Sequence, residues 1–121
     1  MDQTAGRDYR VRKREDVRRI FAEGRRARDR RLTVLAAPNG LAVARCVVAV
    51  SKRHGGAVRR NRIKRLCREA FRLSRGRLTA GWDYVLLPYP GPEATLAGLR
   101  ASVVGLARRV TGGGGRQEGD G

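Results

Sequence analysis

The stretch AVRRNRIKRLCREAFRL, residues 57–73, decides the fold class because it carries the clearest helical pattern in the chain. Its apolar residues recur at intervals of three and four positions, and they are Ile63, Leu66, Cys67, Ala70 and Phe71. Side chains at this spacing share one side of an α-helix. The stretch therefore predicts a helix that packs against a core along that side.

The other side of this predicted helix is basic. The face opposite the apolar stripe carries Asn61, Arg65, Arg68 and Arg72, with Arg60 and Lys64 on one flank and Arg62 on the other. Glu69 is the only acid between Arg59 and Arg72. A solvated helix face normally mixes acids with bases, because like charges four positions apart repel each other. The pattern favours a face that binds an anionic partner.

Three apolar runs outside this helix predict strands at residues 32–37, 46–50 and 82–87. The sequence Pro-Asn-Gly at 38–40 is a turn signal between the first two runs. It predicts that these two strands pair antiparallel, with residues 41–45 available to extend the pair as a third short strand. Residues 25–31 hold five arginines and are expected to form a loop.

Two further helices are predicted near the ends of the chain. Val17, Ile20 and Phe21 have helical spacing, and Gly24 is placed to end that helix. Apolar residues recur again from Pro92 to residue 110. The order α-β-β(-β)-α-β-α predicts a small single-domain α/β (α+β) two-layer sandwich. The domain is expected over residues 1–111, followed by a disordered Gly-rich tail at 112–121.

Composition narrows the class of partner. The 121 residues include 28 Lys and Arg against 11 Asp and Glu, a formal charge of +17, and 25 of the cations are arginines. Segments 7–31, at +7, and 52–77, at +10, account for all of this charge. Arginine suits phosphate oxygens, so a polyanion is the expected partner. Because 40% of its residues are hydrophobic, the chain is expected to form a core. Because it has no run of about 20 apolar residues, no membrane partner is expected, and the protein is expected to be cytoplasmic.

The sequence offers no catalytic residue of its own and no metal site. Its acids are scattered, so neither a metal-binding carboxylate cluster nor an acid/base pair is expected. Cys46, Cys67 and His54 do not have the spacing of a zinc site. Both cysteines are expected in the core, and His54 in a solvated loop. Chemistry alone thus predicts an RNA- or DNA-binding module without catalysis.

Several segments resemble the protein component of bacterial ribonuclease P. They are Ser51-Lys52-Arg53, Gly56-Ala57-Val58, Arg60-Asn61-Arg62-Ile63-Lys64-Arg65 and Arg68-Glu69-Ala70-Phe71-Arg72, with support from Val17 to Phe21, Gly24, Arg30 and Asp83 to Val85. The resemblance implies a subunit of an endoribonuclease ribonucleoprotein that removes the 5′ leader from precursor tRNA. In that family the catalytic RNA holds the active centre and binds the Mg²⁺ ions, so none is expected on the protein alone. The family fold contains a left-handed β-α-β crossover.

The resemblance also implies two sets of site residues. The residues expected to bind the catalytic RNA are Lys52, Arg53, Arg60, Asn61, Arg62, Lys64, Arg65 and Arg68. A cleft between the first helix and the sheet would hold the leader of precursor tRNA, lined by Val17, Phe21, Arg30, Leu32 and Val34. Relatives often have aromatic residues where this chain has Val17 and Leu32, which leaves Phe21 as the stacking platform. Its position next to Ile20 is equally compatible with core packing.

Two other functions are compatible with the composition. A ribosomal or other structural RNA-binding protein would be equally basic, but the motif from Arg60 to Arg65 argues against it. A DNA-binding protein with residues 57–73 as recognition helix would need a preceding helix and a tight turn. The segment before residue 57 instead has the pattern of a strand and a glycine loop, so no DNA partner is expected.

Overall fold

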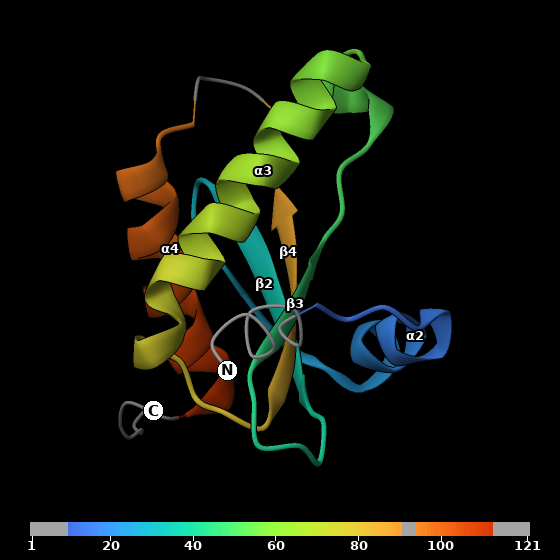
Figure 1. Cartoon of the computed structure of the whole chain (residues 1–121), viewed down its shortest axis with the longest axis vertical. Helices are drawn as coiled ribbons and strands as arrows, with labels where there is room; N and C mark the ends of the chain where they lie inside the picture. Colours follow the sequence, from blue (N-terminus) through green and yellow to red (C-terminus); the bar gives the residue numbers. More distant parts are fainter. Residues whose placement is uncertain (1–9, 91–93, 113–121) are drawn as a thin grey trace, which may run out of the picture.

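The computed structural model describes residues 10–90 and 94–112, which form four strands, three α-helices and two short 3-10 helices (Figure 1). They are α2 (Arg14–Glu23), β1 (Arg25–Arg28), β2 (Leu32–Pro38), β3 (Arg45–Val48), η1 (Lys52–His54), α3 (Ala57–Ser74), η2 (Arg75–Arg77), β4 (Trp82–Pro88) and α4 (Leu96–Thr111). The predicted order of elements is confirmed. The predicted tail from residue 113 onward and the predicted helix start at Pro92 lie outside the described residues; α4 begins at Leu96, capped by Thr95.

The four strands form one sheet in the order β1-β2-β4-β3. β4 runs antiparallel to β2 and parallel to β3, so the predicted antiparallel pairing of residues 32–37 with 46–50 is wrong. The turn after β2 carries the chain past the start of β4, where Asn39 N donates to Gly81 O and Gly81 N donates to Val43 O. β4 lies between β2 and β3, and apart from Asp83 its residues are apolar and largely buried on both faces, which suits a central strand.

Three strands precede α3, and the first of them, β1, lies before β2 in the segment that was predicted to be a loop. β1 pairs antiparallel with β2 at the edge of the sheet, with Arg25 opposite Ala36 and Arg28 opposite Thr33. Its three arginines are exposed and only Ala27 packs toward the core. Exposed charges are compatible with an edge strand, because they oppose pairing with another chain. The arginines therefore specify the edge of the sheet and do not prevent a strand.

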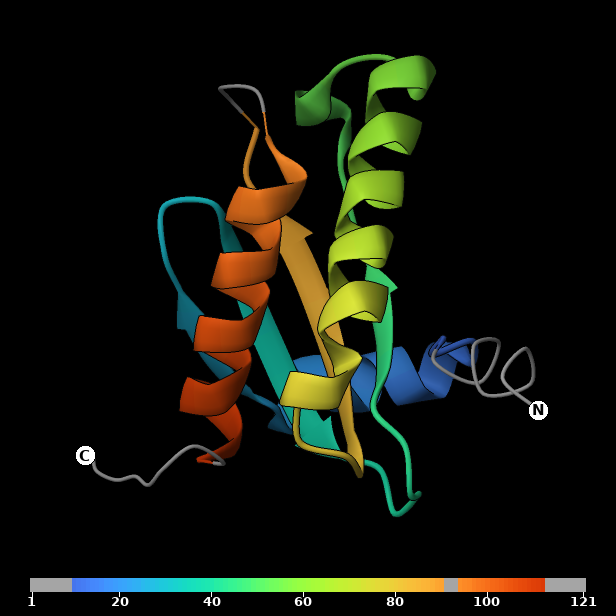
Figure 2. The same cartoon turned by 60° about the vertical axis from the view of Figure 1, so that its left-hand side comes forward.

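The β3-α3-β4 unit crosses with a left hand. Figure 2 shows the sheet from the side that α3 and α4 cover, with β3 and β4 pointing upward and β4 to the left of β3. The chain leaves β3, passes in front of the sheet through α3 and enters β4 on the left of β3. With both strands pointing upward, this is a left-handed crossover. The crossover implied by the family resemblance is confirmed, against the general preference for right-handed connections.

Helices α3 and α4 cover one face of the sheet, and α2 covers part of the other. The main core lies beneath α3 and α4 and includes Leu32, Val34, Cys46, Cys67, Phe71, Tyr84, Leu86, Leu99, Val103 and Val110. A second, smaller cluster lies beneath α2 and includes Val11, Ile20, Leu35, Ala37 and Val85. Both cysteines are buried as predicted, and burial raises the pKa of the Cys67 thiol to about 12. The sheet therefore separates two apolar layers of unequal size.

Candidate nucleic-acid interface

The start of α3 is fixed by the short helix η1, which holds Lys52 and Arg53 exposed. His54 is 5% exposed: its Nδ1 accepts from the backbone N–H of Ser51, and its Nε2 donates to Pro88 O at 2.8 Å. The prediction of a solvated His54 is therefore wrong, because the ring ties the segment before α3 to the end of β4. Gly55 follows with φ +108°, a backbone conformation that favours glycine.

The predicted phase of α3 is confirmed. Cys67, Ala70 and Phe71 are buried, and Ile63 and Leu66 pack partly buried against the same core. Asn61, Arg62 and Arg65 are exposed, whereas Arg60, Lys64 and Arg68 are half-buried. The stems of the half-buried cations cover apolar surface, which is usual for long charged side chains. One helix thus supplies both core packing and a polar outer surface.

Part of the predicted RNA-binding set gathers around one open hollow of about 430 Å³. It is lined by Arg10, Asn61, Lys64, Arg65, Arg68 and Glu69. We call Asn61, Lys64, Arg65 and Arg68 the basic face of α3. The other four predicted residues, Lys52, Arg53, Arg60 and Arg62, lie on η1 or α3 outside this hollow. Sequence analysis missed Arg10, which comes from a segment distant along the chain.

The single acid in this stretch is bound within the helix. Arg72 Nε donates to Glu69 Oε1 at 3.1 Å, and this hydrogen bonding from Arg72 lowers the pKa of Glu69. Glu69 therefore interacts toward the C-terminal end of α3 and remains charged. The four residues of the basic face retain a net charge of +3 around the hollow. Such a concave group of cations and an amide suits phosphate oxygens.

The predicted cleft set is divided between the two faces of the sheet. Leu32 and Val34 are fully buried in the main core beneath α3 and α4, so their prediction as walls of a cleft beside α2 is wrong. Neighbouring residues of a strand point to opposite faces, and it is Thr33 and Leu35 that face the α2 side. All six residues 32–37 are buried, so the sequence shows no alternation that would have assigned the faces.

Helix α2 presents Phe21 to solvent. Phe21 is 44% exposed and belongs to neither apolar cluster, whereas Ile20 is fully buried and Val17 packs partly buried beneath the helix. Phe21 therefore does not pack in the core, which was the alternative left open by the sequence. Arg30 is exposed in the turn between β1 and β2. Of the predicted cleft residues, Phe21 and Arg30 are thus accessible to a partner.

Three residues beyond α2 complete this side of the sheet, and sequence analysis missed all of them. Val47 and Leu87 are partly buried at the margin of the smaller cluster. Tyr89 follows β4, is 37% exposed, and its hydroxyl shares a 2.6 Å hydrogen bond with Thr33 Oγ1. We call Phe21, Val47, Leu87 and Tyr89 the open sheet face. Tyr89 lies between two prolines, a pattern that indicated only the end of a strand.

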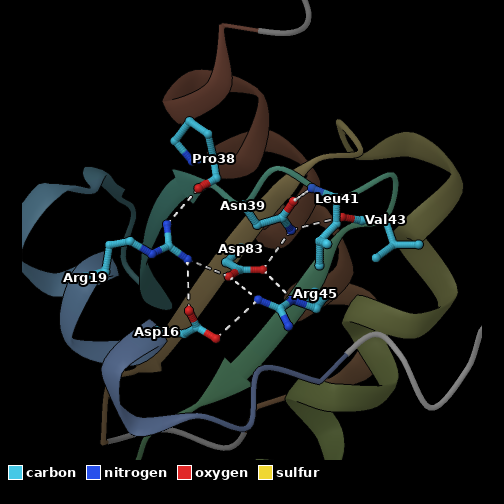
Figure 3. Close-up of polar contacts among 8 residues, drawn as sticks. All are labelled: Asp16, Arg19, Pro38, Asn39, Leu41, Val43, Arg45 and Asp83. Atoms are coloured by element: carbon cyan, nitrogen blue, oxygen red, sulfur yellow. Dashed lines mark hydrogen bonds and ion pairs between the residues drawn. The ribbon is translucent and has the colours of Figure 1, made fainter.

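A buried ionic cluster fixes α2 on the sheet (Figure 3). Asp83 of β4 is fully buried, and its two carboxylate oxygens accept from Arg45 Nε at 2.8 Å and Arg45 Nη2 at 2.7 Å. Arg19 Nη2 and Asn39 Nδ2 add hydrogen bonds of 2.9 and 2.8 Å. Hydrogen bonding to Asp83 raises the pKa of Arg45. Sequence analysis missed this cluster; the one feature that could have indicated it is Asp83 itself, a single acid in an otherwise apolar strand.

Residues 10–90 and 94–112 contain no group of three His, Cys, Asp or Glu side chains that could hold a metal ion. Asp83, the buried acid, already accepts four hydrogen bonds, so its oxygens do not fit a Mg²⁺ site. In the same part of the chain, none of the helices has the length and apolar character needed to cross a membrane.

Known proteins are similar to this chain in sequence and in fold. The family model for ribonuclease P matches residues 6–111. A ribonuclease P protein component from Roseiflexus castenholzii is 44% identical over 106 residues, covering 86% of this chain and 87% of that protein. The structure of the RNase P protein from Thermotoga maritima has a TM-score of 0.75 at 31% identity, covering 84% of this chain and 96% of that one. The RNase P protein from Staphylococcus aureus has a TM-score of 0.72 at 29% identity, with coverages of 84% and 94%. On this sequence match along nearly its whole length, the chain belongs to the ribonuclease P protein family.

Proposed function

We propose that this chain is the RNA-binding subunit of the ribonuclease P ribonucleoprotein, which removes the 5′ leader from precursor tRNA. The basic face of α3 binds the catalytic RNA, and the open sheet face beside α2 binds the leader. The observation that carries the proposal is the basic face itself, a concave, positively charged surface on a helix whose other side is packed in the main core. No observation favours a ribosomal or other structural RNA-binding role.

The basic face supports contacts with an RNA backbone. Lys64, Arg65 and Arg68 line one hollow from successive turns of α3, so their charges can meet neighbouring phosphates. Each neutralised phosphate releases counterions, which provides affinity without reading sequence. Asn61 can both donate and accept hydrogen bonds, so it can contact a ribose or a base edge. This arrangement suits a large, structured RNA of fixed shape.

The open sheet face supports contacts with a single strand. Phe21 and Tyr89 expose aromatic rings, and Val47 and Leu87 add apolar surface beside the strands. Unpaired bases stack on aromatic side chains with little dependence on sequence. A leader varies in sequence between precursor tRNAs, so stacking is better suited to it than hydrogen-bonded readout. In this proposal Arg30, which is exposed in the turn between β1 and β2, contacts the phosphates of the leader.

In this proposal the protein performs no bond cleavage. The catalytic RNA supplies the reactive centre and binds the Mg²⁺ ions that activate water and stabilise developing charge. The protein binds and orients the two RNAs, and its cations reduce repulsion between them. We place this work in the cytoplasm, where precursor tRNA is available to the enzyme.

Cleavage assays test the proposal. Purified protein without RNA is expected to leave precursor tRNA intact, whereas adding it to the catalytic RNA should lower the Mg²⁺ concentration needed for half-maximal cleavage. The reason is that protein cations replace part of the screening otherwise supplied by the metal ion. Robust cleavage by a nuclease-free protein preparation, or an unchanged Mg²⁺ requirement, would contradict the proposal.

Replacing Phe21 by alanine tests the leader contact. The holoenzyme carrying Phe21→Ala should bind precursor tRNA about 5- to 150-fold more weakly, corresponding to loss of about 1–3 kcal/mol of base stacking. Binding of mature tRNA, which lacks the leader, should not change. Equilibrium binding of both RNAs gives their affinity ratio, which we call leader discrimination. Leu41→Ala, which shortens another exposed apolar side chain, is the matched control and should leave this ratio unchanged.

A further inference from the structure

We propose that Asp83 is a positioning residue that fixes the rotation of α2, and so the placement of Phe21, through Arg19. The proposal rests on the proposed binding of the leader by the open sheet face. It assigns a role to a buried carboxylate that itself touches no RNA. The contacts that carry it connect β4, β3, the end of β2 and α2 in one cluster (Figure 3).

The apolar contact between α2 and the sheet is small. The helix has ten residues, REDVRRIFAE, of which Ile20 is buried and Val17 partly buried. A helix this short gains little stability on its own, so tertiary contacts must hold it in place. Two side chains on one stripe also leave rotation about the helix axis weakly restrained. The polar contacts of α2 therefore decide its orientation.

Arg19 supplies those contacts at two points. Its Nη1 donates to Pro38 O at 2.6 Å, and its Nη2 donates to Asp83 Oδ2 at 2.9 Å. Asp16, one turn earlier on α2, lies 3.6 Å from the guanidinium groups of both Arg19 and Arg45. A planar guanidinium that meets two acceptors fixes direction as well as distance. Arg19 therefore connects α2 to both β2 and β4.

Because Asp83 is buried, its partners restrain the elements that carry them. The carboxylate is fully buried, and a buried charge is stable only when it is paired and hydrogen-bonded. Arg45 and Asn39 pair with it from the sheet side, and Arg19 pairs with it from α2. A rotation of α2 would remove Arg19 from Asp83 while leaving the other partners in place. Loss of Arg19 would therefore leave Asp83 paired within the sheet, while this cluster would hold α2 only through the longer Asp16–Arg45 contact of 3.6 Å.

Helical geometry transmits this restraint to Phe21. Successive residues are about 100° apart around a helix. Ile20 points into the sheet, so Arg19 lies on one flank of it and Phe21 on the opposite flank. The exposed fractions agree: Ile20 is buried, the Arg19 side chain is 27% exposed and Phe21 is 44% exposed. Fixing Arg19 at the start of β4 therefore sets the direction in which Phe21 projects from α2.

Leader discrimination by the reconstituted holoenzyme tests the proposal. Arg19→Ala should lower this ratio by roughly five- to tenfold, toward the lower end of the loss expected for one stacked base. Affinity of the protein for the catalytic RNA should stay within about twofold, because the basic face of α3 is untouched. Arg18→Ala removes the same charge from an exposed neighbouring position and should leave the ratio unchanged. Should Arg19→Ala fail to fold, Arg19→Lys, which keeps the charge but not the two-point contact, takes its place with the same criterion.

A double-mutant cycle separates positioning from general weakening. If Arg19 acts through Phe21, Arg19→Ala should have no further effect on leader discrimination once Phe21 is alanine. Additive losses, or an unchanged ratio in Arg19→Ala, would overturn the positioning role. If Phe21→Ala lowers the ratio and Arg19→Ala does not, the leader contact stands and only the positioning role fails. If the wild-type holoenzyme shows no leader discrimination, both proposals are wrong.

Discussion

Replacing Lys64, Arg65 and Arg68 together by alanine should weaken assembly with the catalytic RNA about 100-fold at physiological salt. Each residue lines the same hollow on α3, and three lost contacts at about 1 kcal/mol each give about 3 kcal/mol. The slope of log affinity against log salt should also become shallower by roughly 2, at about 0.7 per single-strand phosphate contact. Filter binding across a salt series measures both quantities.

The matched control removes the same charge elsewhere. Arg100, Arg108 and Arg109 are exposed on α4, and replacing these three by alanine lowers the net charge equally. If the basic face of α3 is the binding surface, this control should weaken assembly far less and change the salt slope by less than one. Equal losses in the two triple variants would show that only total charge matters, and would reject a defined binding face.

Phe71→Ala should lower the free energy of unfolding by about 3–5 kcal/mol. The ring is fully buried and packs against Tyr84 at a centroid distance of 5.9 Å with a tilt of 58°, so truncation removes apolar burial and leaves a cavity. Against a typical total of about 5–15 kcal/mol, this is a large share of the stability. Urea denaturation followed by circular dichroism measures the change.

Arg65→Ala is the control for this prediction, because it lies on the opposite side of the same helix and is exposed. Its unfolding free energy should stay within about 0.5 kcal/mol of the wild type. A larger loss for Arg65→Ala than for Phe71→Ala would mean that the two sides of α3 have been interchanged.

The phase of α3 could be predicted from sequence because helical periodicity is a local property. Residues three and four positions apart share a side whatever the rest of the chain does, and the burial of Cys67, Ala70 and Phe71 follows from that spacing alone. The C-terminal end of α2 could also be predicted locally, because Gly24 directly follows its last turn. The basic face of α3 was predictable for the same reason.

Strand order and the site beside α2 depend on contacts between distant segments. Pairing of β2 with β4 joins residues about 50 positions apart, and no turn signal predicts it. Burial of β2 on both faces removed the alternation that would have placed Leu32 and Val34. Asp83 forms hydrogen bonds with Arg45 and Arg19, which are 38 and 64 residues away in the sequence, so the residues next to Asp83 could not predict these partners.

The central position of β4 delays completion of the sheet while the protein is being synthesised. β2 and β3 leave the ribosome first and do not pair with each other: β2 needs β4 on the side away from β1, and β3 needs β4 to join the sheet. Until residues 82–88 emerge, two apolar strands have unpaired edges, a state prone to association with other chains. Nascent chains ending before Trp82 should therefore remain sensitive to protease and bind chaperones, and the change to a resistant form should occur only when β4 becomes available.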